Sequence, residues 1–182
     1  MSRAYKILNK DGIYFISFAT VGWIDVFTKK EYKDIVVESL SYCQKEKGLV
    51  LHAWCIMTNH IHLIISAKEG YDLAGIIRDM KKYTSKQLIK AIRENPKESR
   101  KKWMLDIFHK AGESNSNNKY YQFWRQDNRP IEIYSNTVID QKLNYLHNNP
   151  VKAGFVENPE DYVYSSAKDY AGEKGLLDIE FL

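Results

Sequence analysis

Two strongly apolar segments separated by three residues limit the folds open to this chain of 182 residues. Residues 49–56 read Leu-Val-Leu-His-Ala-Trp-Cys-Ile, and residues 60–66 read His-Ile-His-Leu-Ile-Ile-Ser. Both are short apolar runs of strand length, and the second is rich in β-branched side chains, which favours strands. The connection Met57-Thr58-Asn59 is short enough for a hairpin. We therefore expect two neighbouring antiparallel strands.

The remaining segments predict an α+β chain with a β-α-β-β-α-β-α order. A first strand is expected over residues 12–22 and a short fourth strand over 131–134. Helical spacing of apolar residues predicts three helices: one opened by a capping box at Thr28 and stopped at Gly48, one capped by Asp72 and ended by Pro96, and one capped by Ser135 or Asn136 and stopped by Pro150. This order is the ferredoxin-like split βαβ plan, with an antiparallel sheet of four to five strands and helices on one face.

The domain organisation expected from composition is simple. The whole chain, 1–182, is predicted to be one domain, with a mobile basic and polar insertion at about 95–119 and a docked C-terminal tail at about 157–182. The chain contains no run of 18 or more apolar residues, so no membrane span is expected, and the N-terminus has no apolar signal core. With only two cysteines, both in apolar contexts, we expect a cytoplasmic protein.

The pair His60 and His62 is the first candidate for chemistry. Side chains alternate across a strand, so these two imidazoles share one face while Ile61 and Leu63 share the other. Two imidazoles on one face can hold a metal ion, although a pair of structural histidines is the ordinary alternative. A metal site needs a further ligand from elsewhere in the fold.

Two sources of that further ligand are open. His52 lies on the neighbouring predicted strand and would complete a three-histidine zinc site of hydrolytic type. The other source is the end of the last helix, where Tyr145 and Asn149 share one face if the helix continues that far. Spacing alone also allows Tyr145 to be an ordinary residue at the edge of the core.

Positive charge is concentrated in one stretch. Residues 78–102 contain ten basic and three acidic residues, whereas the whole chain carries a formal charge of +4. A stripe opposite the apolar helix face recurs every fourth residue and comprises Arg78, Lys82, Lys86 and Lys90. It is either a solvated helix face or a binding track for nucleic-acid phosphates.

These residues resemble those of the single-tyrosine transposases. Residues 54–65, Trp-Cys-Ile-Met-Thr-Asn-His-Ile-His-Leu-Ile-Ile, are similar to that family's His-hydrophobe-His (HUH) motif. Residues 143–156, Leu-Asn-Tyr-Leu-His-Asn-Asn-Pro-Val-Lys-Ala-Gly-Phe-Val, resemble the tyrosine helix of its REP-associated, IS200-like branch. The segment Tyr162-Val163-Tyr164-Ser165-Ser166-Ala167 resembles that branch's C-terminal part, so the resemblance extends over about residues 10–170.

The resemblance implies a function and roles for individual residues. Tyr145 would be the nucleophile that forms a 5′-phosphotyrosine on single-stranded DNA near REP-like hairpins. His60, His62 and Asn149 would bind Mg²⁺ or Mn²⁺, and the basic stripe would bind DNA. The family includes both monomers and homodimers, so Tyr145 would serve its own chain's histidines or a partner's.

Two other functions remain open from the sequence. One is a ferredoxin-like nucleic-acid-binding protein that does not cut, and the other is the three-histidine zinc hydrolase. The first leaves His60, His62 and Tyr145 together without a purpose. The second leaves Tyr145 and the basic stripe without one.

Overall fold

A four-stranded antiparallel sheet forms the centre of the computed structural model, which describes residues 7–115, 120–126 and 129–182. The strands lie in the order β2-β3-β1-β4, where β1 is Ile13–Ala19, β2 is Leu49–Ile56, β3 is His60–Ala67 and β4 is Ile131–Ile133. Chain order and strand order together are those of the ferredoxin-like plan. The expected α+β fold with an antiparallel sheet is confirmed.

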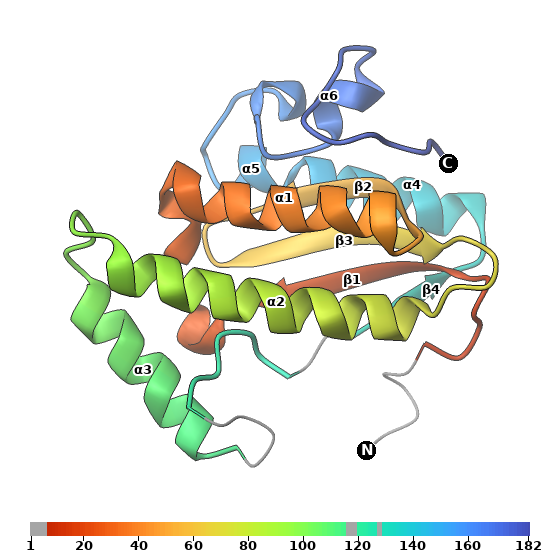
Figure 1. Cartoon of the computed structure of the whole chain (residues 1–182). Helices are drawn as coiled ribbons and strands as arrows, with labels where there is room; N and C mark the ends of the chain where they lie inside the picture. Colours follow the sequence, from red (N-terminus) through yellow and green to blue (C-terminus); the bar gives the residue numbers. More distant parts are fainter. Residues whose placement is uncertain (1–6, 116–119, 127–128) are drawn as a thin grey trace.

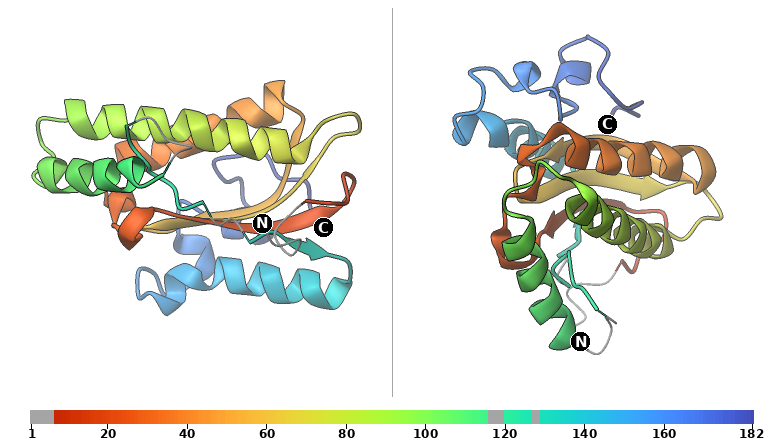
Figure 2. Two further views of the ribbon diagram at one scale, coloured as in Figure 1. Left: turned by 90° about the horizontal axis from the view of Figure 1, so that it is seen from below. Right: turned by 60° about the vertical axis from the view of Figure 1, so that its left-hand side comes forward.

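Two layers of helices enclose the sheet. Helices α1 (Lys30–Glu46) and α2 (Leu73–Glu94) lie side by side across one face (Figure 1). Helix α4 (Asn136–His147) lies on the opposite face (Figure 2). A further helix, α3, covers Lys101–Glu113. The remaining elements are short: α5 (Asn149–Lys152), α6 (Ala167–Tyr170), and the 3₁₀ turns Val21–Trp23, Val26–Thr28 and Pro159–Asp161.

The position of α4 corrects the expectation that the helices occupy one face. Strand alternation divides β3 between two cores: Ile61 and Leu63 pack under α1 and α2, whereas Ile64 packs with Leu146 of α4. Because β1, β2 and β3 carry apolar residues on both faces, each face needs a cover of its own. The side of the sheet under α4 is also the side to which His60 and His62 point.

Helix α3 was not predicted. It lies inside the segment 95–119, for which we expected a mobile polar insertion, and it buries Met104, Phe108 and Gly112. These residues follow one another at intervals of four and share one helix face, and the partly buried Leu105 and Ile107 pack against the same core. Residues 116–119, at the end of the expected mobile stretch, lie outside the described residues.

Two of the three predicted helix caps are confirmed. The Asp72 side chain accepts a hydrogen bond from Ala74 N at the start of α2, and Ser135 Oγ accepts one from Val138 N at the start of α4. The capping box expected at Thr28 is wrong. Helix α1 begins at Lys30, and Thr28 Oγ1 instead accepts a hydrogen bond from Arg100 Nη2.

The C-terminal segment runs along the free edge of β2. Ile56 N donates to Tyr164 O and Ser166 N donates to Trp54 O, each at 2.9 Å, and farther along Glu180 N donates to Leu51 O. These bonds satisfy main-chain groups that an edge strand would otherwise leave unpaired. None of the helices within the described residues is long and apolar enough to cross a membrane.

A buried carboxylate ties the turn between α2 and α3 to the start of α1. The Glu98 side chain is almost completely buried and forms ion pairs with Arg100 at 3.1 Å and Lys29 at 3.5 Å. The hydrogen bonds and positive charge of Arg100, with help from Lys29, outweigh the effect of burial and lower the pKa of Glu98. Arg100 also donates to Asp25 O, which fixes the loop that precedes α1.

Replacing this carboxylate should destabilise the protein in a pH-dependent way. We expect Glu98→Gln to lower the free energy of unfolding by about 1–3 kcal/mol at pH 7, because it leaves two partly buried cations without their buried counter-charge. Since the folded pKa is lowered, the carboxylate stabilises the fold above the unfolded pKa of about 4.5, and this contribution disappears as the pH falls through the folded value. Urea unfolding of both proteins at pH 7 and at lower pH measures the difference. A difference that does not shrink in acid would contradict the assignment.

Candidate active site

The geometry of β3 places two histidines beside each other under α4. In the register of the sheet, His62 lies between Ser17 of β1 and Cys55 of β2. The rings of His60 and His62 are 4.7 Å apart between centroids and nearly perpendicular. The prediction that His60 and His62 share one face of the strand is therefore confirmed.

Hydrogen bonds orient both imidazoles through the same ring nitrogen. Nδ1 of His62 lies 2.5 Å from Ser17 Oγ, and Nδ1 of His60 lies 2.7 Å from Asn59 Oδ1. Nε2 of His62 is buried and has no hydrogen-bond partner in the described part of the chain. A buried imidazole nitrogen without a partner, fixed in orientation by a bond on the other nitrogen, is the arrangement expected of a metal ligand.

Burial keeps both histidines uncharged at neutral pH. It is the main reason that the pKa of His62 falls to about 3, and the nearby His60 and Lys142 lower it further. Burial also lowers the pKa of His60, against the opposing effect of Asp25. Neutral imidazole is the form that binds cations.

Tyr145 of α4 lies against the histidines of its own chain. Its ring centroid is 5.2 Å from that of His62, in an edge-to-face arrangement, and its side chain remains 44% exposed. A phenol in this place has one side against the imidazole and the other open to solvent. The two candidate groups that lie 83 residues apart in the sequence thus form one site.

Three residues around Tyr145 were not predicted. Phe15 of β1 stacks on His62 and meets the Tyr145 ring edge-on, at centroid distances of 5.4 and 6.0 Å. Lys142 Nζ lies over the Phe15 ring and Lys152 Nζ lies 5.9 Å from the centre of the Tyr145 ring. Lys142 is three residues before Tyr145, a spacing that could have indicated a shared helix face. Phe15 enters only through the pairing of β1 with β3.

Asn149 lies at the end of the same helix, but α4 stops at His147 and a separate turn, α5, begins at Asn149. Its Nδ2 donates to Tyr145 O at 2.8 Å, so the side chain folds back on the helix that carries the tyrosine. Within the described residues, no hydrogen bond or ring contact joins Asn149 to either histidine. Its Oδ1 accepts no hydrogen bond there and is available to a cation.

His52 does not join this pair. Its Nδ1 lies 2.8 Å from Glu180 O and its Nε2 lies 2.9 Å from Ser66 Oγ, so both nitrogens have partners. It sits at a bulge of β2, farther along the sheet than Cys55, which faces His62. Over residues 7–115, 120–126 and 129–182, no three His, Cys, Asp or Glu side chains are grouped so that they could hold a metal. A three-histidine zinc site is thus not formed.

The C-terminal segment fixes the end of the tyrosine helix. Ser166 Oγ lies 2.9 Å from His147 Nε2 and accepts a hydrogen bond from Trp54 N at the edge of β2. Both side chains are buried. Since His147 is two residues beyond Tyr145, this contact ties the helix that carries Tyr145 to the sheet that carries the histidines.

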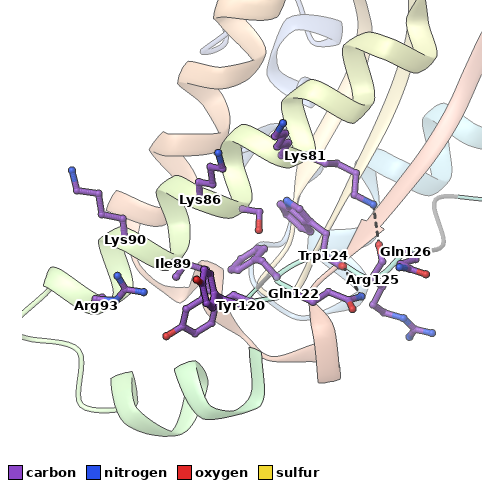
Figure 3. Close-up of a pocket in the computed structure, with 14 residues that line it drawn as sticks. Lys81, Lys86, Ile89, Lys90, Arg93, Tyr120, Gln122, Trp124, Arg125 and Gln126 are labelled. Carbon is purple, nitrogen blue, oxygen red and sulfur yellow. Dashed lines mark hydrogen bonds between the residues drawn. The ribbon is translucent and has the colours of Figure 1, made fainter. Parts of the chain in front are cut away.

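A basic groove of about 750 Å³ lies on the other face of the sheet, between α2 and residues 120–126 (Figure 3). Three residues of the predicted stripe line it: Lys82, Lys86 and Lys90. Arg78 does not line it and pairs instead with Asp79 at 3.2 Å. The structure adds Lys81, Arg93 and Arg125, together with the aromatic residues Tyr120, Tyr121, Phe123 and Trp124.

Comparison with known proteins identifies the family. Residues 14–120 match the family model described as "Transposase IS200 like". The chain belongs to the IS200-like transposases. The family match covers more than half of the chain and includes the two histidines, while Tyr145 lies beyond it.

Two proteins that are similar to this chain are named as REP-associated tyrosine transposases. A putative REP-associated tyrosine transposase of Haemophilus influenzae is 29% identical over 170 residues, which are 91% of this chain and 85% of that protein. A solved structure of a REP-associated tyrosine transposase bound to a REP hairpin superposes with a TM-score of 0.66, at 18% identity, over 99% of this chain and 92% of the other. The resemblance noted in the sequence is confirmed, and so is the fold.

Removing the contact between helix α4 and the sheet should destabilise this part of the protein. We expect Ser166→Ala to lower the free energy of unfolding by about 1–3 kcal/mol, because Trp54 N and His147 Nε2 lose a buried partner. Urea unfolding gives the value. The matched control is Ser114→Ala, which removes an exposed hydrogen bond to Lys110 O at the end of α3 and should cost less than about 0.5 kcal/mol. Equal losses in the two variants would show that the buried contact has no special weight.

Proposed function

We propose that this IS200-like transposase cleaves and rejoins single-stranded DNA near hairpins through a covalent bond between Tyr145 and a 5′ phosphate. The contact between Tyr145 and His62 within one chain is the observation that carries this proposal. Few sites place a half-exposed phenol against a buried imidazole that has an unused nitrogen. The pairing has a clear use in phosphoryl transfer, where a nucleophile and a phosphate-binding centre must be adjacent.

The proposed step exchanges one phosphodiester for another. The phenol oxygen of Tyr145 attacks the phosphorus, its proton goes to solvent, and the P–O bond to the 3′ oxygen breaks. That oxygen takes up a proton and leaves as a free 3′-hydroxyl, while the 5′ phosphate stays on the tyrosine. The reverse attack by a 3′-hydroxyl rejoins the strand. No nucleotide is consumed, because one phosphoester replaces another.

His60, His62 and Asn149 are the residues that would hold a divalent cation, Mg²⁺ or Mn²⁺. When bound, such an ion supplies positive charge that stabilises negative charge on the scissile phosphate. The unpartnered Nε2 of His62 and the free Oδ1 of Asn149 support this assignment. Ser17 and Asn59 hold the two imidazoles so that Nε2 is the ligand in each.

Two lysines give Tyr145 a positive surrounding of its own. Lys142 and Lys152 lie on either side of the Phe15–Tyr145 pair, on α4 and α5. Cations here attract the phosphate to the phenol and stabilise the negative charge that develops during attack. The protein's own positive charge at the site thus comes from the helix side, because the histidines on the strand side are neutral.

The proposed partner is single-stranded DNA with REP-like hairpins. The groove supplies the cationic side chains that phosphates need, among them Lys82, Lys86 and Lys90. The similar solved transposase is bound to a REP hairpin, which supports a hairpin as the partner here. Because Tyr145 meets the histidines of its own chain, one protomer contains every residue of the proposed site, and a monomer is sufficient.

The reaction can be tested by trapping the covalent product. With Mn²⁺ or Mg²⁺, the wild-type protein should form a denaturant-resistant adduct on hairpin-bearing single-stranded DNA. Tyr145→Phe should abolish the adduct and keep DNA binding, since only the attacking oxygen is lost. EDTA, or His62→Ala, should reduce adduct formation by at least about 100-fold. Denaturing gel electrophoresis of end-labelled DNA measures it.

The controls separate the assignments. Tyr134→Phe removes the hydroxyl from a more exposed tyrosine just before α4 and should leave the yield unchanged. An adduct that persists in Tyr145→Phe would mean that another residue is the nucleophile. Binding without any adduct in the wild type would favour the non-cutting DNA-binding protein.

The groove makes a separate prediction about salt. Replacing Lys82 and Lys86 together by alanine should weaken binding to all single-stranded sequences and lower the slope of log K against log salt by about 1.5. Fluorescence anisotropy at several salt concentrations measures the slope. The matched control replaces Lys45 and Lys47, two exposed lysines at the end of α1, and so changes the net charge equally. If both double variants behave alike, the groove lysines are only a solvated surface.

A further inference from the structure

Trp23 is an exposed aromatic side chain held in an unfavourable backbone conformation. Its φ is +54°, in the left-handed region that bulky residues avoid, and its side chain is 52% exposed. Two main-chain contacts hold it there: Trp23 N donates to Thr20 O, and Asn59 Nδ2 donates to Trp23 O. Strain of this kind is usually maintained at functional sites, and burial of the indole does not explain it.

The indole borders the candidate active site. The centroids of the Trp23 and His60 rings are 5.9 Å apart, and the angle between the ring planes is 73°, an edge-to-face arrangement. Asn59, which donates a hydrogen bond to the Trp23 carbonyl, also hydrogen-bonds Nδ1 of His60 through its Oδ1. Trp23 and His60 are thus positioned by one shared side chain.

A cation connects Trp23 with the basic groove. The Arg125 guanidinium lies over the indole at 5.3 Å from the ring centre, and Arg125 is also one of the residues that line the groove. Its main chain is fixed by a hydrogen bond from Arg125 N to Ala19 O at the end of β1. These contacts therefore link the groove on the α2 face to His60 on the α4 face, through Arg125 and then Trp23.

We propose that Trp23 stacks on an unpaired base beside the phosphate that is attacked, and that Arg125 guides the strand from the groove to that position. This inference rests on the proposed function, since it assumes single-stranded DNA at the histidine pair. An indole offers a flat surface to any base, so the contact positions the strand without reading its sequence. Stacking of this kind contributes about 1–3 kcal/mol per base, or roughly 5- to 100-fold in affinity.

The test uses a scan of abasic sites in a protein that cannot cut. In the Tyr145→Phe background, Kd is measured by fluorescence anisotropy for a DNA hairpin with single-stranded arms of mixed sequence, with one base removed at successive positions. One position should stand out, with binding about 5- to 100-fold weaker when its base is missing. In Tyr145→Phe/Trp23→Gly, intact DNA should bind that much more weakly, and removal of the same base should have no further effect.

The choice of variants keeps the loop folded. Glycine adopts a φ of +54° without strain, so Trp23→Gly removes the ring and leaves the backbone conformation accessible. Trp23→Phe should restore most of the abasic penalty, because it restores an aromatic surface. The matched control, Trp103→Ala, removes an indole of equal exposure (53%) from α3 and should leave the profile unchanged.

The outcomes separate this inference from the proposed function. An abasic profile that is the same with and without Trp23 would overturn the stacking role, even if wild-type protein forms the adduct. A Trp23-dependent profile without any adduct would support the stacking role and refute the cleavage chemistry. Absence of binding to every probe would overturn both.

Discussion

The alternation of side chains along β3 is the constraint on which the site depends. Ile61 and Leu63 are almost completely buried under α1 and α2, and this burial forces His60 and His62 to the opposite face. A slip of one residue would place the imidazoles in the main core and two aliphatic side chains under the tyrosine helix, at a cost of several kcal/mol. The hydrophobic effect therefore sets the geometry of the polar site, and the histidines need no contact of their own to hold the register.

The two faces of the sheet carry different kinds of charge. Under α4 the histidines are neutral because they are buried, and the nearby positive charge comes from Lys142 and Lys152. On the α2 side the groove is lined with lysine and arginine side chains that stay in contact with water. In the proposed function, a phosphate would meet long-range attraction on one face and short-range, dehydrated contacts on the other. Binding and chemistry can therefore respond differently to salt, since screening acts mainly on exposed charges.

The sequence predicted the parts of the fold that have local periodicity. The hairpin β2–β3 and helices α1, α2 and α4 follow from apolar patterns, and Asp72 and Ser135 from capping chemistry. Helix α3 was missed because it stands in a stretch rich in charged and polar residues, whose composition resembled a loop. The two-sided packing of the sheet was also missed, although both faces of β2 are apolar in the sequence.

The site divides in the same way. That His60 and His62 share a face follows from alternation alone, whereas the approach of Tyr145 came from a family resemblance, since no local pattern relates α4 to β3. Ser17 and Phe15 reach His62 only through the register between β1 and β3, which is a long-range property. Trp23 carries no sequence signal beyond the preceding Gly22, because what singles it out is a backbone angle and neighbours from two distant segments, residues 59–60 and Arg125.

The Glu98–Arg100 network connects a remote turn with the mouth of the site. Arg100 holds Asp25 and Thr28 by hydrogen bonds, and these residues belong to the loop that follows Trp23. Through these hydrogen bonds, the stretch between α2 and α3 braces the loop at residues 25–28, which follows Trp23, without itself touching the site. Relatives that differ in this stretch can differ in how firmly the loop is held while keeping every reacting residue, so substrate preference can diverge through the brace alone.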